Sequence, residues 1–122
     1  MTRPKNQQTG TLGEDHARRY LEHIGYQIVT TNWHCQFGEI DIIARDGDAW
    51  TFVEVKTRRT KSTESAYASI TPAKREKLVK SVHTYLNDHE LDDVQWRIDV
   101  IAIALNTGKQ PIIEHVKDAL DW

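Results

Sequence analysis

The sequence predicts an α/β domain in which a mixed five-stranded sheet has a helix on each face. Apolar residues recur at helical spacing in two segments and at strand spacing in five, in the order helix, three strands, helix, two strands. The central strand-like runs carry apolar residues on both sides, which is typical of a sheet covered on both faces. A chain of 122 residues has room for one such domain.

The beginning of the chain predicts a short arm followed by a helix. Residues 1–10 are polar and lack apolar periodicity, so we expect a flexible N-terminal arm and a single domain over residues 11–122. Helical spacing from Leu12 to Ile24 predicts the first helix, with Gly25 as its C-cap. Glu14 lies at the edge of the buried stripe, where it either complements the helix dipole or leans over the neighbouring strands.

The other elements follow from alternation and from capping residues. Thr71-Pro72 supplies an N-cap and a first-turn proline for the second helix.

Arg97 and Asp99 share one side of a long strand, and we expect an internal ion pair there rather than a catalytic role for Asp99. The segment 33–37 is either a loop or an irregular start of the next strand. The predicted elements outside the central hairpin are a strand over 26–32, a helix over 72–87, a strand over 94–105 and an edge strand over 111–116.

The stretch from Gly38 to Lys56 predicts a β-hairpin. Two apolar runs flank the Asp46-Gly47 pair, which suits a tight turn. A turn at this pair places Glu39 opposite Glu54, whereas a turn one residue later places Asp41 opposite Glu54. Both registers give the same two sides. One side carries Glu39, Asp41, Ile43, Trp50, Phe52, Glu54 and Lys56, and the other carries Ile40, Ile42, Ala44, Thr51, Val53 and Val55.

Three carboxylates gather on the first side of this hairpin, at the end away from the turn. Like charges on neighbouring strands destabilise each other unless a cation lies between them. Carboxylate oxygens suit Mg²⁺ or Mn²⁺. Lys56 would then lie where an ammonium group could orient or deprotonate an attacking water, or offset charge on a phosphate. The alternative is a half-exposed acidic edge on which Lys56 only pairs with Glu54.

Composition indicates an anionic partner and gives no sign of a membrane. The formal net charge is −2, yet residues 54–80 contain eight Lys or Arg against three Glu. Such a stretch suits a phosphate-facing surface, although a solvated face has the same composition. The single Cys35 excludes an internal disulfide framework and agrees with a reducing cytosol. No segment resembles a membrane span or a signal peptide, so we expect a cytoplasmic protein.

An Asp on one strand, followed thirteen residues later by Glu-x-Lys on the next, resembles the Asp…(Asp/Glu)-x-Lys nuclease superfamily. This superfamily includes restriction endonucleases and archaeal Holliday-junction resolvases. More narrowly, the chain is identified as a member of the YraN-like family of small bacterial proteins. The motifs that carry this resemblance, between Thr11 and Ala104, are G-x-L-G-E, GEIDIIARDGD, FVEVKTR, ITPAKREKL and RIDVIAI. The resemblance implies a restriction-endonuclease-like fold.

The resemblance also implies roles for individual residues. Asp41 and Glu54 would bind the metal, together with the main-chain carbonyl of Val55. Glu39 is typical of the narrower family and is a further candidate ligand. The implied catalytic set is Asp41, Glu54, Lys56 and Glu14.

We therefore expect a Mg²⁺- or Mn²⁺-dependent endonuclease that hydrolyses phosphodiester bonds in branched or single-stranded DNA. The alternatives are a non-catalytic accessory protein that binds nucleic acid with the same fold, and an interaction module that docks through its acidic cluster. DNA is expected over RNA. A homodimer would fit because the similar resolvases cut two strands symmetrically. The candidate nucleic-acid contacts are Arg58, Arg59, Lys61, Lys74, Arg75 and Lys77.

Overall fold

The order of elements is the one expected from the sequence. The computed structural model of the chain describes residues 5–64, 68–106 and 108–119. Its elements are α1 (Lys5–His23), β1 (Gln27–Cys35), β2 (Gly38–Asp46), β3 (Ala49–Arg58), α3 (Pro72–Asp88), β4 (Trp96–Ala104) and β5 (Ile112–Val116). The predicted mixed α/β fold is thus confirmed.

Two boundaries differ from the expectation. Helix α1 begins at Lys5, so residues 5–10 of the expected arm are helical, while residues 1–4 lie outside the described part of the chain. Strand β1 continues to Cys35, which makes most of the undecided segment 33–37 strand and leaves a two-residue turn before β2.

The sheet has the strand order β1-β2-β3-β4-β5. Only β3 and β4 are parallel, and the other neighbours are antiparallel. Strand β5 lies at an edge, as its leading proline predicts. The parallel pair is central, which is where a sheet covered on both faces places strands with apolar residues on both sides.

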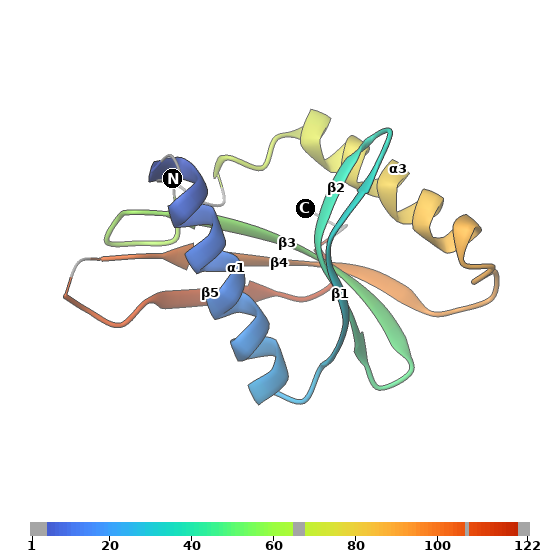
Figure 1. Ribbon diagram of the computed structural model, residues 1–122, viewed down its shortest axis with the longest axis horizontal. Coiled ribbons are helices and arrows are strands. Elements are labelled where there is room, and N and C mark those ends of the chain that lie inside the picture. Colours follow the sequence, from blue (N-terminus) through green and yellow to red (C-terminus); the bar gives the residue numbers. More distant parts are fainter. Residues whose placement is uncertain (1–4, 65–67, 107, 120–122) are drawn as a thin grey trace.

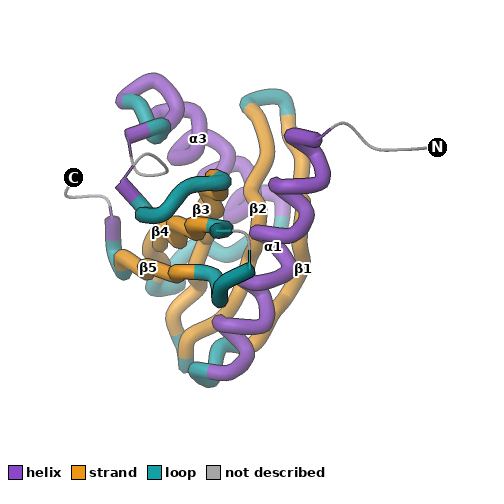
Figure 2. Tube along the Cα trace, turned by 90° about the vertical axis from the view of Figure 1, so that its left-hand side faces the viewer, coloured by secondary structure: helices purple, strands orange, loops and turns teal. Residues whose placement is uncertain are grey.

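A helix covers each face of this sheet (Figures 1 and 2). On one face Ala17 and Leu21 of α1 pack on the strands, and on the other face Tyr85 of α3 contacts the rings of Trp33 and Phe52. The α1 core contains Ala17, Leu21, Tyr26, Ile42, Ala44, Val53, Val55, Ile101 and Ile103. The α3 core contains Ile40, Ile43, Phe52, Leu78, Val82, Tyr85, Leu86 and Ile98.

The β2–β3 hairpin opens into a fork. Asp46 pairs with Ala49, so the turn falls at Gly47 and Asp48, the later of the two registers considered. The pairing between the strands ends at Ile42 and Val53. Beyond that point β3 continues along β4, whereas β2 stays with β1 and turns away from β3 (Figure 1).

The fork corrects the expected division of the hairpin into two sides. Ile40 was expected beside Ile42, but it packs with Ile43 and Phe52 in the α3 core. Strict alternation holds for a regular ladder, and β2 is no longer paired with β3 at this point. Glu39 and Asp41 of β2 therefore lie on a part of the strand that is not paired with the part of β3 that carries Glu54.

The predicted pair of Arg97 and Asp99 is confirmed as an internal ion pair, with Nε and Oδ1 2.9 Å apart. Asp99 is fully buried and also contacts His115 Nε2 at 2.7 Å and the Tyr26 hydroxyl at 3.1 Å. Burial acts to raise the pKa of Asp99, but the hydrogen bonds from His115 and Arg97 outweigh it and lower the pKa. Arg97 also binds Asp46, so this network fixes the hairpin turn against β4 and β5.

Gly13 sets the distance between α1 and β3. A Cβ atom at this position would lie 1.7 Å from Thr57 Oγ1, so a larger residue would force the helix off the strand. Because Glu14 follows directly, this close approach also holds its carboxylate near the fork.

We expect Gly13→Ala to destabilise the fold by about 1–3 kcal/mol, the usual effect of overpacking, and to lower the melting temperature by several degrees. Gly10→Ala is the matched control, because a Cβ atom at Gly10 meets nothing within 4 Å in the same helix. That change should be neutral or stabilise by up to about 1 kcal/mol. Equal melting temperatures for the two variants would contradict this account of the contact.

Candidate functional site

Three carboxylates converge at the fork. Glu14 from α1 and Glu39 and Asp41 from β2 each place an oxygen within 4.8 Å of the others. Glu14 reaches this point because α1 lies close to β3 at Gly13, and the other two reach it because β2 turns away from β3. An all-oxygen donor set at this spacing suits a hard divalent cation.

Asp41 occupies the gap between the separating strands. Its Oδ2 accepts a hydrogen bond of 2.8 Å from the main-chain N–H of Val55. In a regular sheet this N–H would donate to a backbone carbonyl of β2, but β2 and β3 are not paired at this point. In an extended strand the C=O of a residue points to the same side as its N–H, so the Val55 carbonyl also faces the gap.

Burial and mutual repulsion disfavour the charged forms of these groups. Burial is the main cause that raises the pKa of Asp41 far above its ordinary value, and the charge of Glu54 is the next. Burial also raises the pKa of Glu14, followed by the charge of Glu39. Without a cation, then, the surroundings of the fork favour protonation of Asp41 and Glu14.

Asn32 relieves part of this repulsion, and sequence reasoning missed it. With its amide nitrogen turned toward the carboxylates, the side chain lies 3.0 Å from Glu14 Oε2 and 2.7 Å from Glu39 Oε1. Asn32 has a left-handed backbone with φ of 52°, a conformation that asparagine tolerates better than most residues. No spacing rule identifies it, because its partners come from a helix and from the next strand.

Glu54 and Lys56 lie beside the three-carboxylate group. Lys56 Nζ is 3.0 Å from Glu54 Oε1, and the two side chains are 21% and 17% exposed. Glu54 is outside the group of three, yet its charge contributes to the raised pKa of Asp41. Both residues line a cavity of about 240 Å³ on the α3 side, together with Glu39.

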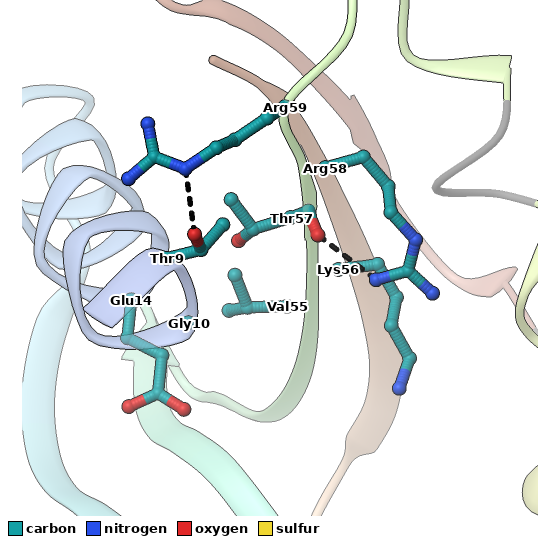
Figure 3. A pocket seen from close by; sticks show the side chains of 8 residues that line it. All are labelled: Thr9, Gly10, Glu14, Val55, Lys56, Thr57, Arg58 and Arg59. Carbon is teal, nitrogen blue, oxygen red and sulfur yellow. Dashed lines mark hydrogen bonds between the residues drawn. The ribbon is translucent and has the colours of Figure 1, made fainter. Parts of the chain in front are cut away.

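A larger cavity of about 680 Å³ lies on the α1 side of the fork (Figure 3). Glu14 from the helix and Lys56 from the strand line it, and Figure 3 shows their side chains on either side of Val55. Arg58 and Arg59 line the same cavity, and Arg59 Nε donates to Thr9 Oγ1. Lys56 lines both cavities.

The predicted nucleic-acid contacts separate into two groups. Arg58 and Arg59 line the larger cavity, and Lys74 and Lys77 line the smaller one. The other two candidates, Lys61 and Arg75, line neither of these cavities. The cations near the fork thus lie on both sides of it, at the end of β3 and directly after it, and on α3.

No helix within the described ranges has the length and apolar character needed to cross a bilayer.

The model of the family described as "Uncharacterised protein family UPF0102" matches residues 13–103. The chain belongs to this family. A "UPF0102 protein" of Chloroflexus aurantiacus is 44% identical over 117 residues, which cover 95% of this chain and 94% of the relative. A relative from Geobacter sulfurreducens is 41% identical over 116 residues, covering 95% and 91% of the two chains. One from Syntrophus aciditrophicus is 44% identical over 117 residues, covering 96% and 91%.

The UPF0102 match confirms the resemblance to the YraN-like family. The matched range runs from Gly13, which holds α1 against β3, to Ile103 near the end of β4. It therefore includes every candidate metal ligand and Lys56.

We expect Asp41→Asn to stabilise the metal-free protein at pH 8. The variant keeps an acceptor for the Val55 N–H and removes the cost of protonating a carboxyl group that is ionised in the unfolded chain at this pH. Because the pKa of Asp41 is raised in the fold, its stabilising contribution is present below the ordinary aspartate pKa and lost as the pH rises toward the raised value. The gain should be at least about 1 kcal/mol, measured by thermal denaturation in EDTA from pH 5 to pH 9.

Asp48→Asn is the matched control, because Asp48 is exposed at the other end of the same hairpin. Its melting temperature should follow the wild type at every pH. Added Mn²⁺ should stabilise the wild type and Asp48→Asn but not Asp41→Asn. Lower stability of Asp41→Asn in EDTA at pH 8, or equal stabilisation of all three proteins by Mn²⁺, would contradict the assignment.

Proposed function

We propose that this protein is a divalent-metal-dependent endonuclease that hydrolyses phosphodiester bonds in DNA. The observation that carries the proposal is the convergence of Glu14, Glu39 and Asp41 at the fork, directly beside the Glu54–Lys56 pair. Charged groups of the same sign are rarely brought together at a partly buried point without a bound cation. The arrangement also agrees with the resemblance to the Asp…(Asp/Glu)-x-Lys nuclease superfamily, whose restriction-endonuclease-like fold we propose for this chain.

The residues present fit Mg²⁺ or Mn²⁺. Asp41 and Glu54 are the proposed ligands, with the Val55 carbonyl facing the same gap and Glu39 as a further carboxylate. These ions prefer oxygen ligands and accept phosphate oxygens beside carboxylates. When bound, such an ion would supply positive charge to the phosphate and lower the pKa of a nearby water.

Lys56 and Glu14 supply the remaining groups. Lys56 Nζ is held 3.0 Å from Glu54, so its ammonium group is positioned at the edge of the site. From there it can orient an attacking water or offset the charge that builds on the phosphate. Glu14 has a raised pKa and reaches the fork from the helix, so it can carry a proton to or from that water.

Basic residues on both sides of the fork support a nucleic-acid substrate. A strand crossing the site would meet Arg58 and Arg59 on one side and Lys74 and Lys77 on the other. Such contacts attract phosphates without reading sequence. DNA with branched or single-stranded character is the proposed substrate, and a homodimer would allow paired cuts.

The direct test is cleavage of labelled junction, flap and duplex DNA with Mg²⁺ or Mn²⁺. We expect Glu54→Ala and Lys56→Ala to lose at least roughly 100-fold in rate, since each removes a group that acts on the reacting phosphate. EDTA should abolish cleavage.

Two changes in α1 test the role of Glu14, one at the fork and one as its matched control. Glu14→Gln alters the carboxylate at the fork, whereas Glu22→Gln alters an exposed one that pairs with Arg18. Only the first should slow cleavage. Equal products from wild type and Glu54→Ala would exclude catalysis by this site, and salt-dependent DNA binding without cleavage under either metal would favour the non-catalytic accessory protein.

A further inference from the structure

A large aromatic side chain lies exposed next to the candidate site. Phe37 occupies the two-residue turn between β1 and β2 and is 36% exposed. Figure 2 shows this turn at the top of the view, between α3 and α1. The aromatic residues Trp33 on β1 and Trp50 on β3 instead pack on the α3 core.

The fold makes little use of the Phe37 ring. It belongs to neither of the two cores, and Lys80 Nζ lies 5.8 Å from its centroid. A cation over an exposed ring contributes only about 0.5–1 kcal/mol. Single exposed apolar residues are common on protein surfaces, so the feature that distinguishes Phe37 is its position beside the candidate site.

Phe37 lines the smaller cavity together with the catalytic candidates. Glu54 and Lys56 line it from β3, and Lys74 and Lys77 line it from α3. Its volume of about 240 Å³ is below the roughly 300 Å³ at which pockets for drug-sized ligands begin. The cavity thus combines a flat apolar ring, cations for phosphates and a size suited to one planar group.

We propose that Phe37 is a stacking platform for one unpaired nucleobase next to the phosphate that is cleaved. This inference rests on the proposed function and names its substrate class. Lys74 and Lys77 would bind the phosphates that flank this base. The substrate is then a strand that is free at the cleavage point, such as a flap, a splayed arm or an open junction.

Stacking on a side chain distinguishes free strands from continuous duplex. In a duplex both faces of each base are already covered by neighbouring bases, so a base must leave the stack before it can lie on Phe37. A base in a single strand needs no such step. Stacking on an aromatic side chain is tolerant of sequence because every base has a π-face.

The test uses binding, so that it does not depend on cleavage. Short single strands with 2-aminopurine at successive positions are titrated with the full-length protein in Ca²⁺, and 2-aminopurine fluorescence reports stacking. We expect quenching at one position, and a loss of single-strand affinity of roughly 5- to 100-fold in Phe37→Ala. Duplex affinity should stay unchanged, and Phe37→Trp should restore the single-strand affinity.

Ile112→Ala is the matched control, because Ile112 is 47% exposed on β5 and lies outside this cavity. It should bind both kinds of DNA like the wild type, and all variants should share the wild-type melting temperature. Equal single-strand affinity of wild type and Phe37→Ala, or an equal loss on single strand and duplex, would overturn the proposal. Position-specific quenching without cleavage of any DNA would retain the stacking subsite and refute only the nuclease.

Discussion

The separation of β2 from β3 after the Ile42–Val53 pair is the constraint on which the rest of the structure depends. It removes a ladder partner from the backbone of β3, and the Asp41 carboxylate replaces that partner at the Val55 N–H. A backbone donor inside a sheet has to be satisfied, and here the acceptor is an acidic side chain. One break in strand pairing therefore opens a gap and places a carboxylate inside it.

The two helices bring charged side chains to this gap. Gly13 lets α1 approach β3 closely, and this approach brings Glu14 to the fork. On the other face α3 carries Lys74 and Lys77 to the cavity that Glu54 and Lys56 line. The buried network around Asp99 holds the far end of the hairpin, so β2 bends at the fork and not at its turn. The carboxylates at the fork are unfavourable for the fold alone, which is typical of groups kept for binding or catalysis.

Periodicity and capping predicted the order of elements because each helix and strand has a clear pattern of its own. Thr71 and Pro72, for example, begin α3 as expected. The same reasoning placed Ile40 on the wrong face of the sheet. Strict alternation assumes that two strands stay paired along their length, and it cannot show where one strand separates from the other. Asn32 could not be predicted either, since its contacts with Glu14 and Glu39 arise only from tertiary packing. Asp41, Glu54 and Lys56 were candidates from their spacing, but spacing alone could not show that Glu54 lines one cavity and that Lys56 lines two.

We propose that the fork binds a divalent cation through Asp41. Anomalous diffraction from crystals soaked in Mn²⁺ measures this directly, because the ion itself provides the signal. We expect a peak at about 2.0–2.3 Å from an Asp41 oxygen, with Glu54 or the Val55 carbonyl as a further ligand. Crystals with Mn²⁺ bound elsewhere and no peak at the fork would contradict it.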